Sequence, residues 1–272
     1  YIVDDGIDVE PDTTLTVAPG VLVKFAVKNV EIEVMGTLTA TRAAFTSLRD
    51  DTVAGDTNGD GPGYASRGDW DALEFREGSS NSALRGCTVR YGGLGTDGND
   101  ANVEVHDASP DILECIVTHG GDYGIGLWNA SPTIRDCELR NNHRAGIGCE
   151  DASAPEITEN LVAQNQIGIR VRGGSTPVIS GNTIAGNLEY GVENDDSDIC
   201  VDARNNWWGH ASGPLDDSDD TGENCGYYNP DGLGDRVSDH VRYDPWDGDD
   251  SLETVILALT VAGDGLVRVS PP

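Results

Sequence analysis

The stretch SPTIRDCELRNNHRAGIGCEDAS, Ser131 to Ser153, decides the fold, because its landmarks return at a fixed spacing along the chain. Prolines recur at steps of 22, 23 and 22 residues, and glycines at steps of 22, 22 and 23. The proline series is Pro110, Pro132, Pro155 and Pro177, and the glycine series is Gly124, Gly146, Gly168 and Gly191. A third series with the same period is Cys115, Cys137, Asn160, Asn182 and Asn205. A repeat of this length indicates one supersecondary unit per period.

Each unit contains three short apolar stretches separated by Asn- and Gly-bearing turns, and none carries a helical apolar stripe. Such a unit is too thin to bury its own apolar face, so it must stack on its neighbours. Alternation in the last strand of each unit predicts which side chains point inward. The predicted core ladders are Leu73 and Phe75, Val103 and Val105, Ile125 and Leu127, Ile147 and Cys149, and Ile169 and Val171.

The residues between these core positions are predicted to face outward in two columns. One column is Glu74, Glu104, Gly126, Gly148, Arg170 and Glu193, and the other is Arg76, His106, Trp128, Glu150, Arg172 and Asp195. Stacked strands rise by about 4.8 Å each, so five coils present a strip on the order of 20 Å long.

Composition limits the partners of the chain. Among 272 residues there are 48 acidic and 17 basic ones, for a net charge of -31. A uniformly acidic surface repels phosphate, so nucleic acid is excluded as a partner. High acidity with only two lysines favours a salt-adapted protein that is secreted or displayed at the cell surface. No apolar run approaches the ~18 residues of a membrane span, and we expect any secretion signal to have been removed.

Several segments resemble the right-handed parallel β-helix proteins of the pectate-lyase-like, carbohydrate-associated type. The resemblance rests on Ser131 to Ser153, on TPVISGNTIAGNLEYGVEND, on TLTVAPGVLVKF followed by VMGTLTATRAAFTSLRDD, and on NNWWGHASGP with a later YDPW. It implies an all-β solenoid of ~22-residue coils with an N-terminal cap and a Trp-rich C-terminal cap, spanning residues 1–250. It further implies an asparagine ladder of Asn160, Asn182 and Asn205, with Cys115 and Cys137 as substitutes.

The six cysteines divide into two groups. Cys87, Cys115 and Cys137 are predicted to form a buried ladder, and Cys149 to occupy a core slot, so these four are expected to be free thiols. Cys200 and Cys225 bracket a loop rich in Asp and Gly with little core of its own. They are either a disulfide, contributing roughly 3 kcal/mol, or two more free thiols.

The tryptophans near the end have two interpretations. Trp207 and Trp208 could stack on sugars, but together with Trp246 they suit a cap over the exposed core of the last coil, which we favour. Beyond them, residues 251–272 are predicted to be a linker or the start of a further β-rich module of the same chain.

The stretch DTNGDG, Asp56 to Gly61, is typical of a calcium loop, because Asp56, Asn58 and Asp60 place oxygen ligands on alternate residues. The twelfth position is Arg67, so Asp51 or Asp69 would have to supply the missing acid. We expect a structural Ca²⁺ there, since the loop lies in an excursion before the regular coils. A second acidic loop, Gly95 to Asp100, could hold another ion or be simply solvated.

The candidate binding site is the outward face near Arg170 and Arg172, beside Glu150, Trp128 and His106. Gly126 and Gly148 are predicted to leave a shallow trough there, with His119, Tyr123, His143 and Arg144 in the adjoining turns. Exposed pairs on a sheet are also commonly just solvated. Three functions stay open: a module contacting extracellular polysaccharide, a polysaccharide lyase-type enzyme acting on acidic glycans, and a purely structural rod or assembly subunit.

Overall fold

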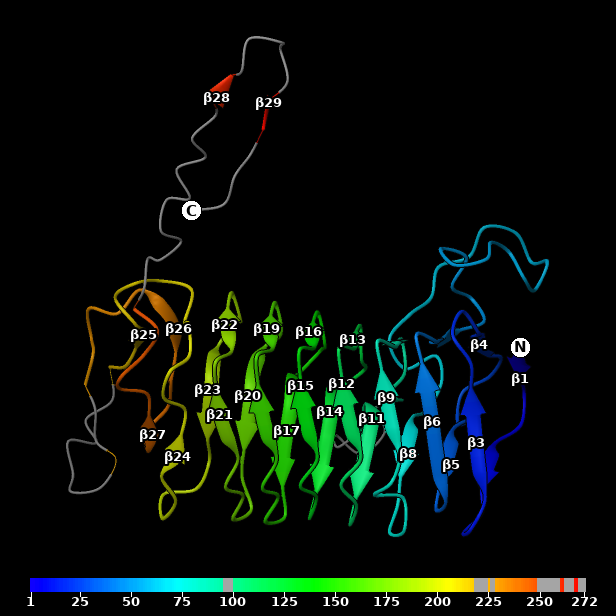
Figure 1. The fold of residues 1–272 in the computed structure, drawn as a ribbon, viewed down its shortest axis with the longest axis horizontal. Coiled ribbons are helices and arrows are strands. Elements are labelled where there is room, and N and C mark those ends of the chain that lie inside the picture. Colours follow the sequence, from blue (N-terminus) through cyan, green and yellow to red (C-terminus); the bar gives the residue numbers. More distant parts are fainter. Residues whose placement is uncertain (95–99, 218–224, 226–227, 249–259, 262–266, 269–272) are drawn as a thin grey trace.

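The computed structural model describes residues 1–94, 100–217, 225, 228–248, 260–261 and 267–268. In this part of the chain every regular element is a strand, and no helix is long and apolar enough to cross a bilayer. Three long parallel sheets run along the molecule, and Figure 1 shows successive coils lying side by side along its longest axis. The expected all-β solenoid is confirmed.

We name the sheets A, B and C. Sheet A contains β1 (Ile2–Val3), β4 (Leu22–Phe25), β7 (Ala44–Ser47), β10 (Thr88–Arg90), β13 (Ile116–Thr118), β16 (Glu138–Arg140), β19 (Leu161–Ala163) and β22 (Thr183–Ala185). Sheet B contains β2 (Ile7–Val9), β5 (Ile32–Val34), β8 (Leu73–Phe75), β11 (Ala101–His106), β14 (Tyr123–Trp128), β17 (Ala145–Glu150), β20 (Ile167–Val171) and β23 (Tyr190–Asn194). Sheet C contains β3 (Thr14–Val17), β6 (Thr37–Thr41), β9 (Ala83–Arg85), β12 (Asp111–Leu113), β15 (Thr133–Arg135), β18 (Glu156–Thr158), β21 (Val178–Ser180), β24 (Val201–Asp202) and β27 (Val241–Arg242).

Each regular coil passes from sheet C to sheet A to sheet B, as β12, β13 and β14 do. Two smaller pairs complete the described strands: β25 (Pro214–Leu215) with β26 (Gly234–Arg236), and β28 (Thr260–Val261) with β29 (Val267–Arg268). Most of the predicted linker or further module at 251–272 lies outside the described residues.

The core is a set of aliphatic ladders. Val103 pairs with Ile125, Ile125 with Ile147, and Ile147 with Ile169 in sheet B, and these side chains are fully buried. All the core positions predicted from the alternation are buried. The predicted register is therefore confirmed, and it fixes which side chains reach the outer face.

The turns between sheets C and A hold the asparagine ladder. Asn182 Oδ1 accepts a hydrogen bond from the Asn160 amide at 2.9 Å, and Asn206 Oδ1 accepts one from the Asn182 amide at 2.9 Å. The prediction of Asn205 is wrong, because the last step lengthens to 24 residues and brings Asn206 into line. Asn205 is exposed instead, with a φ of 58° that suits asparagine in a tight turn.

The turns between sheets A and B contain a second ladder that the sequence analysis did not identify. Asn165 Oδ1 accepts from the Asn142 amide at 3.0 Å, and Asn187 Oδ1 accepts from the Asn165 amide at 3.1 Å. Both ladders satisfy buried turn amides that have no partner in the sheets, so both sets of turns are held in one conformation.

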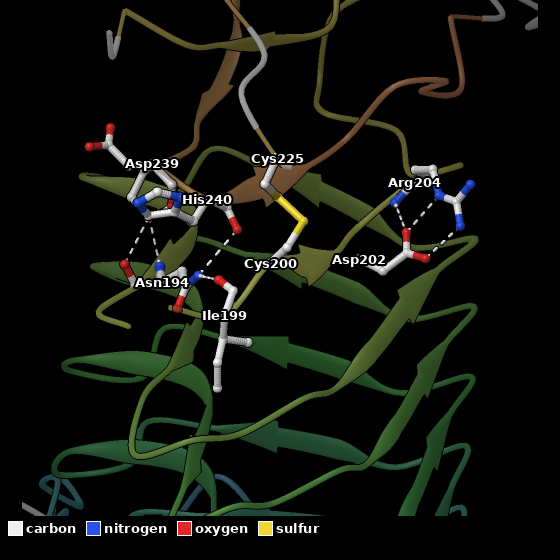
Figure 2. The surroundings of a disulfide bond; sticks show 9 residues. Asn194, Ile199, Cys200, Asp202, Arg204, Cys225, Asp239 and His240 are labelled. Carbon is white, nitrogen blue, oxygen red and sulfur yellow. Dashed lines mark hydrogen bonds and ion pairs between the residues drawn. A yellow bond between two sulfur atoms is a disulfide. The ribbon is translucent and has the colours of Figure 1, made fainter. Parts of the chain in front are cut away.

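The six cysteines comprise four free thiols and one disulfide-bonded pair. Cys87, Cys115, Cys137 and Cys149 are buried free thiols, as expected. Cys200 and Cys225 form a disulfide with a Cα to Cα distance of 5.6 Å, which joins the residue before β24 to a residue between β25 and β26. Figure 2 shows this bond beside Asn194, whose amide nitrogen donates to the carbonyls of Ile199 and His240.

Aromatic side chains close the C-terminal end of the solenoid. Trp208 and Tyr243 are fully buried and belong to the main core cluster, and Trp246 packs against that cluster. A buried Trp208 cannot present a face to a sugar, which argues against sugar stacking there, and Trp207 is half-buried. The cap itself stays a prediction. At the other end, first-coil residues such as Ile2 and Val17 line an apolar hollow of about 440 Å³.

Candidate functional site

The outer face of sheet B carries the predicted binding residues. Its first column is continuous through the parallel pairing of Glu74, Glu104, Gly126, Gly148, Arg170 and Glu193. In the second column, His106 pairs with Trp128 and Trp128 with Glu150. The structure thus brings the predicted side chains onto one face, within or directly after hydrogen-bonded strands.

Glu150 is the hub of this face. Its carboxylate is almost fully buried and accepts hydrogen bonds from Tyr123 Oη at 2.9 Å, Trp128 Nε1 at 3.2 Å and Arg172 Nη2 at 2.6 Å. Burial and then Glu150 raise the pKa of Tyr123 to about 12. His106 stacks on Trp128 with ring centroids 4.5 Å apart. Four predicted site residues, His106, Trp128, Glu150 and Arg172, therefore form one interlocked group.

The expected trough over the two glycines is absent. A Cβ on Gly126 would lie 2.4 Å from Trp128 Cη2, and one on Gly148 would lie 2.9 Å from Tyr123 Cε2. The glycines therefore make room for aromatic rings of the protein itself, which fold back across the sheet.

Both predicted arginines are already paired with carboxylates. Arg172 is bonded to Glu150, as described above, and Arg170 pairs with Glu193 Oε2 at 3.0 Å and Asp195 Oδ2 at 2.5 Å. A ligand carboxylate at this position must compete with these internal partners. This C-terminal part of the face is a preorganised polar surface on which both arginine charges are paired with carboxylates.

The N-terminal half of the same face is strongly acidic. Glu74, Glu104 and His106 place one ligand atom each within 4.8 Å of one another, and so do Asp71, Asp100 and Glu104. Burial and then Glu104 raise the pKa of Asp71 to about 6. Alternation places Glu74 and Glu104 in an outward column, but the cluster itself has no sequence signal, since Asp71 and Asp100 lie outside the predicted columns.

Glu31 is a further carboxylate beside this acidic cluster. Burial, followed by Glu74 and Asp71, raises the pKa of Glu31 to about 7. Crowded carboxylates repel one another, and a cation or a proton relieves that repulsion. Arg76 offsets part of the charge through an ion pair with Glu74 at 2.6 Å.

The predicted calcium loop lies in the excursion between β7 and β8, which extends away from the coils in Figure 1. Asp56 accepts hydrogen bonds from the amides of Gly59 at 2.7 Å and Gly61 at 2.9 Å, and Asn58 Nδ2 donates to Asp60 Oδ2 at 2.8 Å. The loop is thus closed on itself by its own predicted ligand side chains.

The two acids predicted to complete the loop lie in different places. Asp69 is buried and accepts from Ser47 Oγ at 2.8 Å and from the Ser66 amide at 2.9 Å. Asp51 accepts from the Gly63 amide at 2.6 Å, while its Oδ1 is buried with no hydrogen-bond partner among the described residues. Of the two, Asp51 has the oxygen that a cation could use. The second acidic loop falls at 95–100, of which only Asp100 is described.

A buried lysine fastens the base of the excursion. Lys24 is 1% exposed, and its Nζ donates to the Asp50 carbonyl at 2.9 Å, the Gly55 carbonyl at 3.3 Å and Thr57 Oγ1 at 2.9 Å. Alternation places Lys24 outward between the core residues Val23 and Phe25, so its burial under the excursion has no local sequence signal.

Comparison with known proteins finds one matching family. The family model described as a right-handed beta helix region matches residues 67–207, just over half of the chain. No curated protein and no solved structure matches the chain. The matched span begins where the excursion returns to the coils and ends at the C-terminal cap.

Proposed function

The chain belongs to the right-handed β-helix family, and from that premise we propose that it is a calcium-stabilised module, secreted or displayed at the cell surface, that contacts extracellular polysaccharide. The observation that supports this best is the outer face of sheet B. Its eight strands make a straight strip of roughly 34 Å at the spacing of parallel strands. A long flat strip suits a linear polymer better than a compact ligand.

The chemistry of the strip also supports carbohydrate. The half-buried Arg172 and Trp128 offer donors and an aromatic edge, and the buried Glu150 holds both side chains in fixed positions. Polar groups that are already oriented lose little conformational entropy when a ligand binds. Extracellular placement is supported by the Cys200 to Cys225 disulfide, because such bonds persist in oxidising compartments.

The lyase-type alternative requires a cation or a free arginine to neutralise a uronate carboxylate, together with a base. The pairing of Arg170 and Arg172 with internal carboxylates disfavours that chemistry on this face. A structural rod, in contrast, needs only the stacked coils. A binding experiment separates these functions.

The test is a glycan array probed with the purified protein, followed by an absorbance assay for unsaturated products on each glycan that binds. We expect binding without product formation, and weaker binding by Trp128→Ala. Val178→Ala, on the exposed face of sheet C, is the matched control and should bind as the wild type does. If no glycan binds, the structural rod is the function that remains. Unsaturated products would establish the lyase-type activity.

The calcium part of the proposal has its own test. A cation that binds only the folded chain raises its stability by mass action, so chelation should lower the melting temperature (Tm) and added Ca²⁺ should restore it. Mg²⁺ should restore it less well, because it demands a tighter octahedral shell. Asp56→Ala should reproduce the chelated state. If Glu104→Gln reproduces the chelated state and Asp56→Ala does not, the ion binds at the acidic cluster of sheet B. A Tm that chelation leaves unchanged would contradict calcium binding.

A further inference from the structure

A groove crosses the turns between sheets A and B, away from the residues predicted to bind ligand. It encloses about 380 Å³ and is lined by Arg67, Asn142, His143, Gln164, Gln166 and Leu188, together with Glu189. Three successive coils contribute to it, because Asn142, Asn165 and Asn187 of the second ladder occupy the same position in consecutive turns. The ladder therefore holds the floor of the groove in a fixed shape.

Arg67 reaches this groove from the excursion. Where the excursion returns, the carbonyl of Gly92 accepts hydrogen bonds from the amides of both Gly68 at 3.2 Å and Gly121 at 2.9 Å. This close packing of glycines lets the returning chain cross the turns. Arg67 Nη2 then donates to the Asn141 carbonyl at 2.7 Å, 74 residues further along the sequence.

The charge of Arg67 is not neutralised in the way the arginines of sheet B are. Within the described residues, its guanidinium contacts a backbone carbonyl and no carboxylate. The imidazole of His143 is exposed beside it. Burial, and then Arg67 and Arg140, lower the pKa of His119, which lies in the turn one coil before His143.

The remaining lining groups suit the hydroxyls and the apolar face of a sugar. Gln164 lines the groove and accepts from Asn141 Nδ2 at 3.3 Å through its Oε1, so its amide nitrogen is left as a donor. Gln166 Nε2 donates to Glu189 Oε1 at 2.8 Å, so its own amide oxygen is left as an acceptor. Leu188 is 82% exposed and supplies an apolar surface.

We propose that this groove binds a sugar unit bearing a carboxylate, with Arg67 and His143 receiving the carboxylate and the two glutamines contacting hydroxyls. The inference rests on the proposed function and names the chemical class of the polysaccharide. A guanidinium matches the planar carboxylate with two parallel hydrogen bonds. A single guanidinium with one imidazole suits a singly charged group such as one carboxylate.

The test is calorimetric binding of a glucuronate hexamer and of the same hexamer with its carboxyls reduced to hydroxymethyl groups. The wild type should bind the acid form at least tenfold more tightly. Arg67→Gln should lose about tenfold or more in affinity for the acid form, since a hydrogen bond to a charged group contributes about 1.5–3 kcal/mol. Its affinity for the reduced form should be unchanged.

Arg85→Gln is the matched control, because Arg85 is an exposed arginine on sheet C paired with Asp111. It should bind both hexamers as the wild type does, and a Tm for each variant checks folding. Equal affinity of the wild type for the two hexamers, or acid binding that Arg67→Gln leaves intact, would overturn the inference and keep the proposed function. Absence of binding to both hexamers would overturn the inference, whereas the proposed function is overturned only if no glycan on the array binds.

Discussion

Replacing Ile169 by aspartate tests the register on which every statement about the outer face depends. Ile169 is fully buried in β20, paired with Ile147 on one side and Val192 on the other. Truncating a buried isoleucine to alanine costs about 2–5 kcal/mol. Placing an unpaired carboxylate there adds several kcal/mol more. The sum is a large part of the roughly 5–15 kcal/mol that stabilises a typical domain.

We therefore expect Ile169→Asp to abolish cooperative unfolding at ordinary temperature, measured by circular dichroism during urea and thermal denaturation. Ile169→Val should fold, with a loss of about 0.5–1.5 kcal/mol. The matched control is Val178→Asp, the same kind of change at a 54% exposed position of sheet C, which should shift stability by less than about 1 kcal/mol. A stable Ile169→Asp together with an unfolded Val178→Asp would show that inward and outward residues are exchanged.

Two further predictions concern charge and cross-linking. Glu31→Gln should raise the Tm at pH 8 and leave it nearly unchanged at pH 4. Burial, then Glu74, raise the pKa of Glu31 from 4.5 to about 7, so the stability associated with the protonated carboxyl is present below pH 4.5 and lost as pH rises through 7. Equal shifts of Tm at both pH values would contradict this assignment. Cys200→Ser should lower the free energy of unfolding by roughly 3 kcal/mol in a chemical denaturation series, and an unchanged value would mean that the cap holds its loop without the bond.

The repeat made the solenoid core predictable. A period of 22 or 23 residues and strict alternation in the last strand place residues such as Ile147 and Val171 inside, whatever the turns do, because one face of each strand must be buried. The same reasoning failed at Asn205, where a 24-residue step replaced the regular one at the edge of the cap. Periodicity predicts a position only as long as no residue is inserted.

The site was less predictable because it depends on side-chain conformations and on the path of the excursion. Columns of outward residues follow from alternation, but nothing in the sequence indicates that Trp128 folds back over Gly126 or that Glu150 gathers three donors. Arg67 meets Asn141 only because a long irregular segment returns across the glycine turns. Contacts of this kind join distant segments and have no local sequence signal.

The most direct test of polysaccharide contact is a crystal structure of the protein with the glucuronate hexamer bound. The account predicts a chain of sugar density that enters the groove between sheets A and B, with one carboxylate within about 3 Å of the Arg67 guanidinium. Sugar density placed elsewhere, with Arg67 still bonded only to the Asn141 carbonyl, would contradict the assignment of the groove. Crystals grown at high hexamer concentration that show no sugar on any face would contradict the inference that the protein binds a polysaccharide bearing carboxylates.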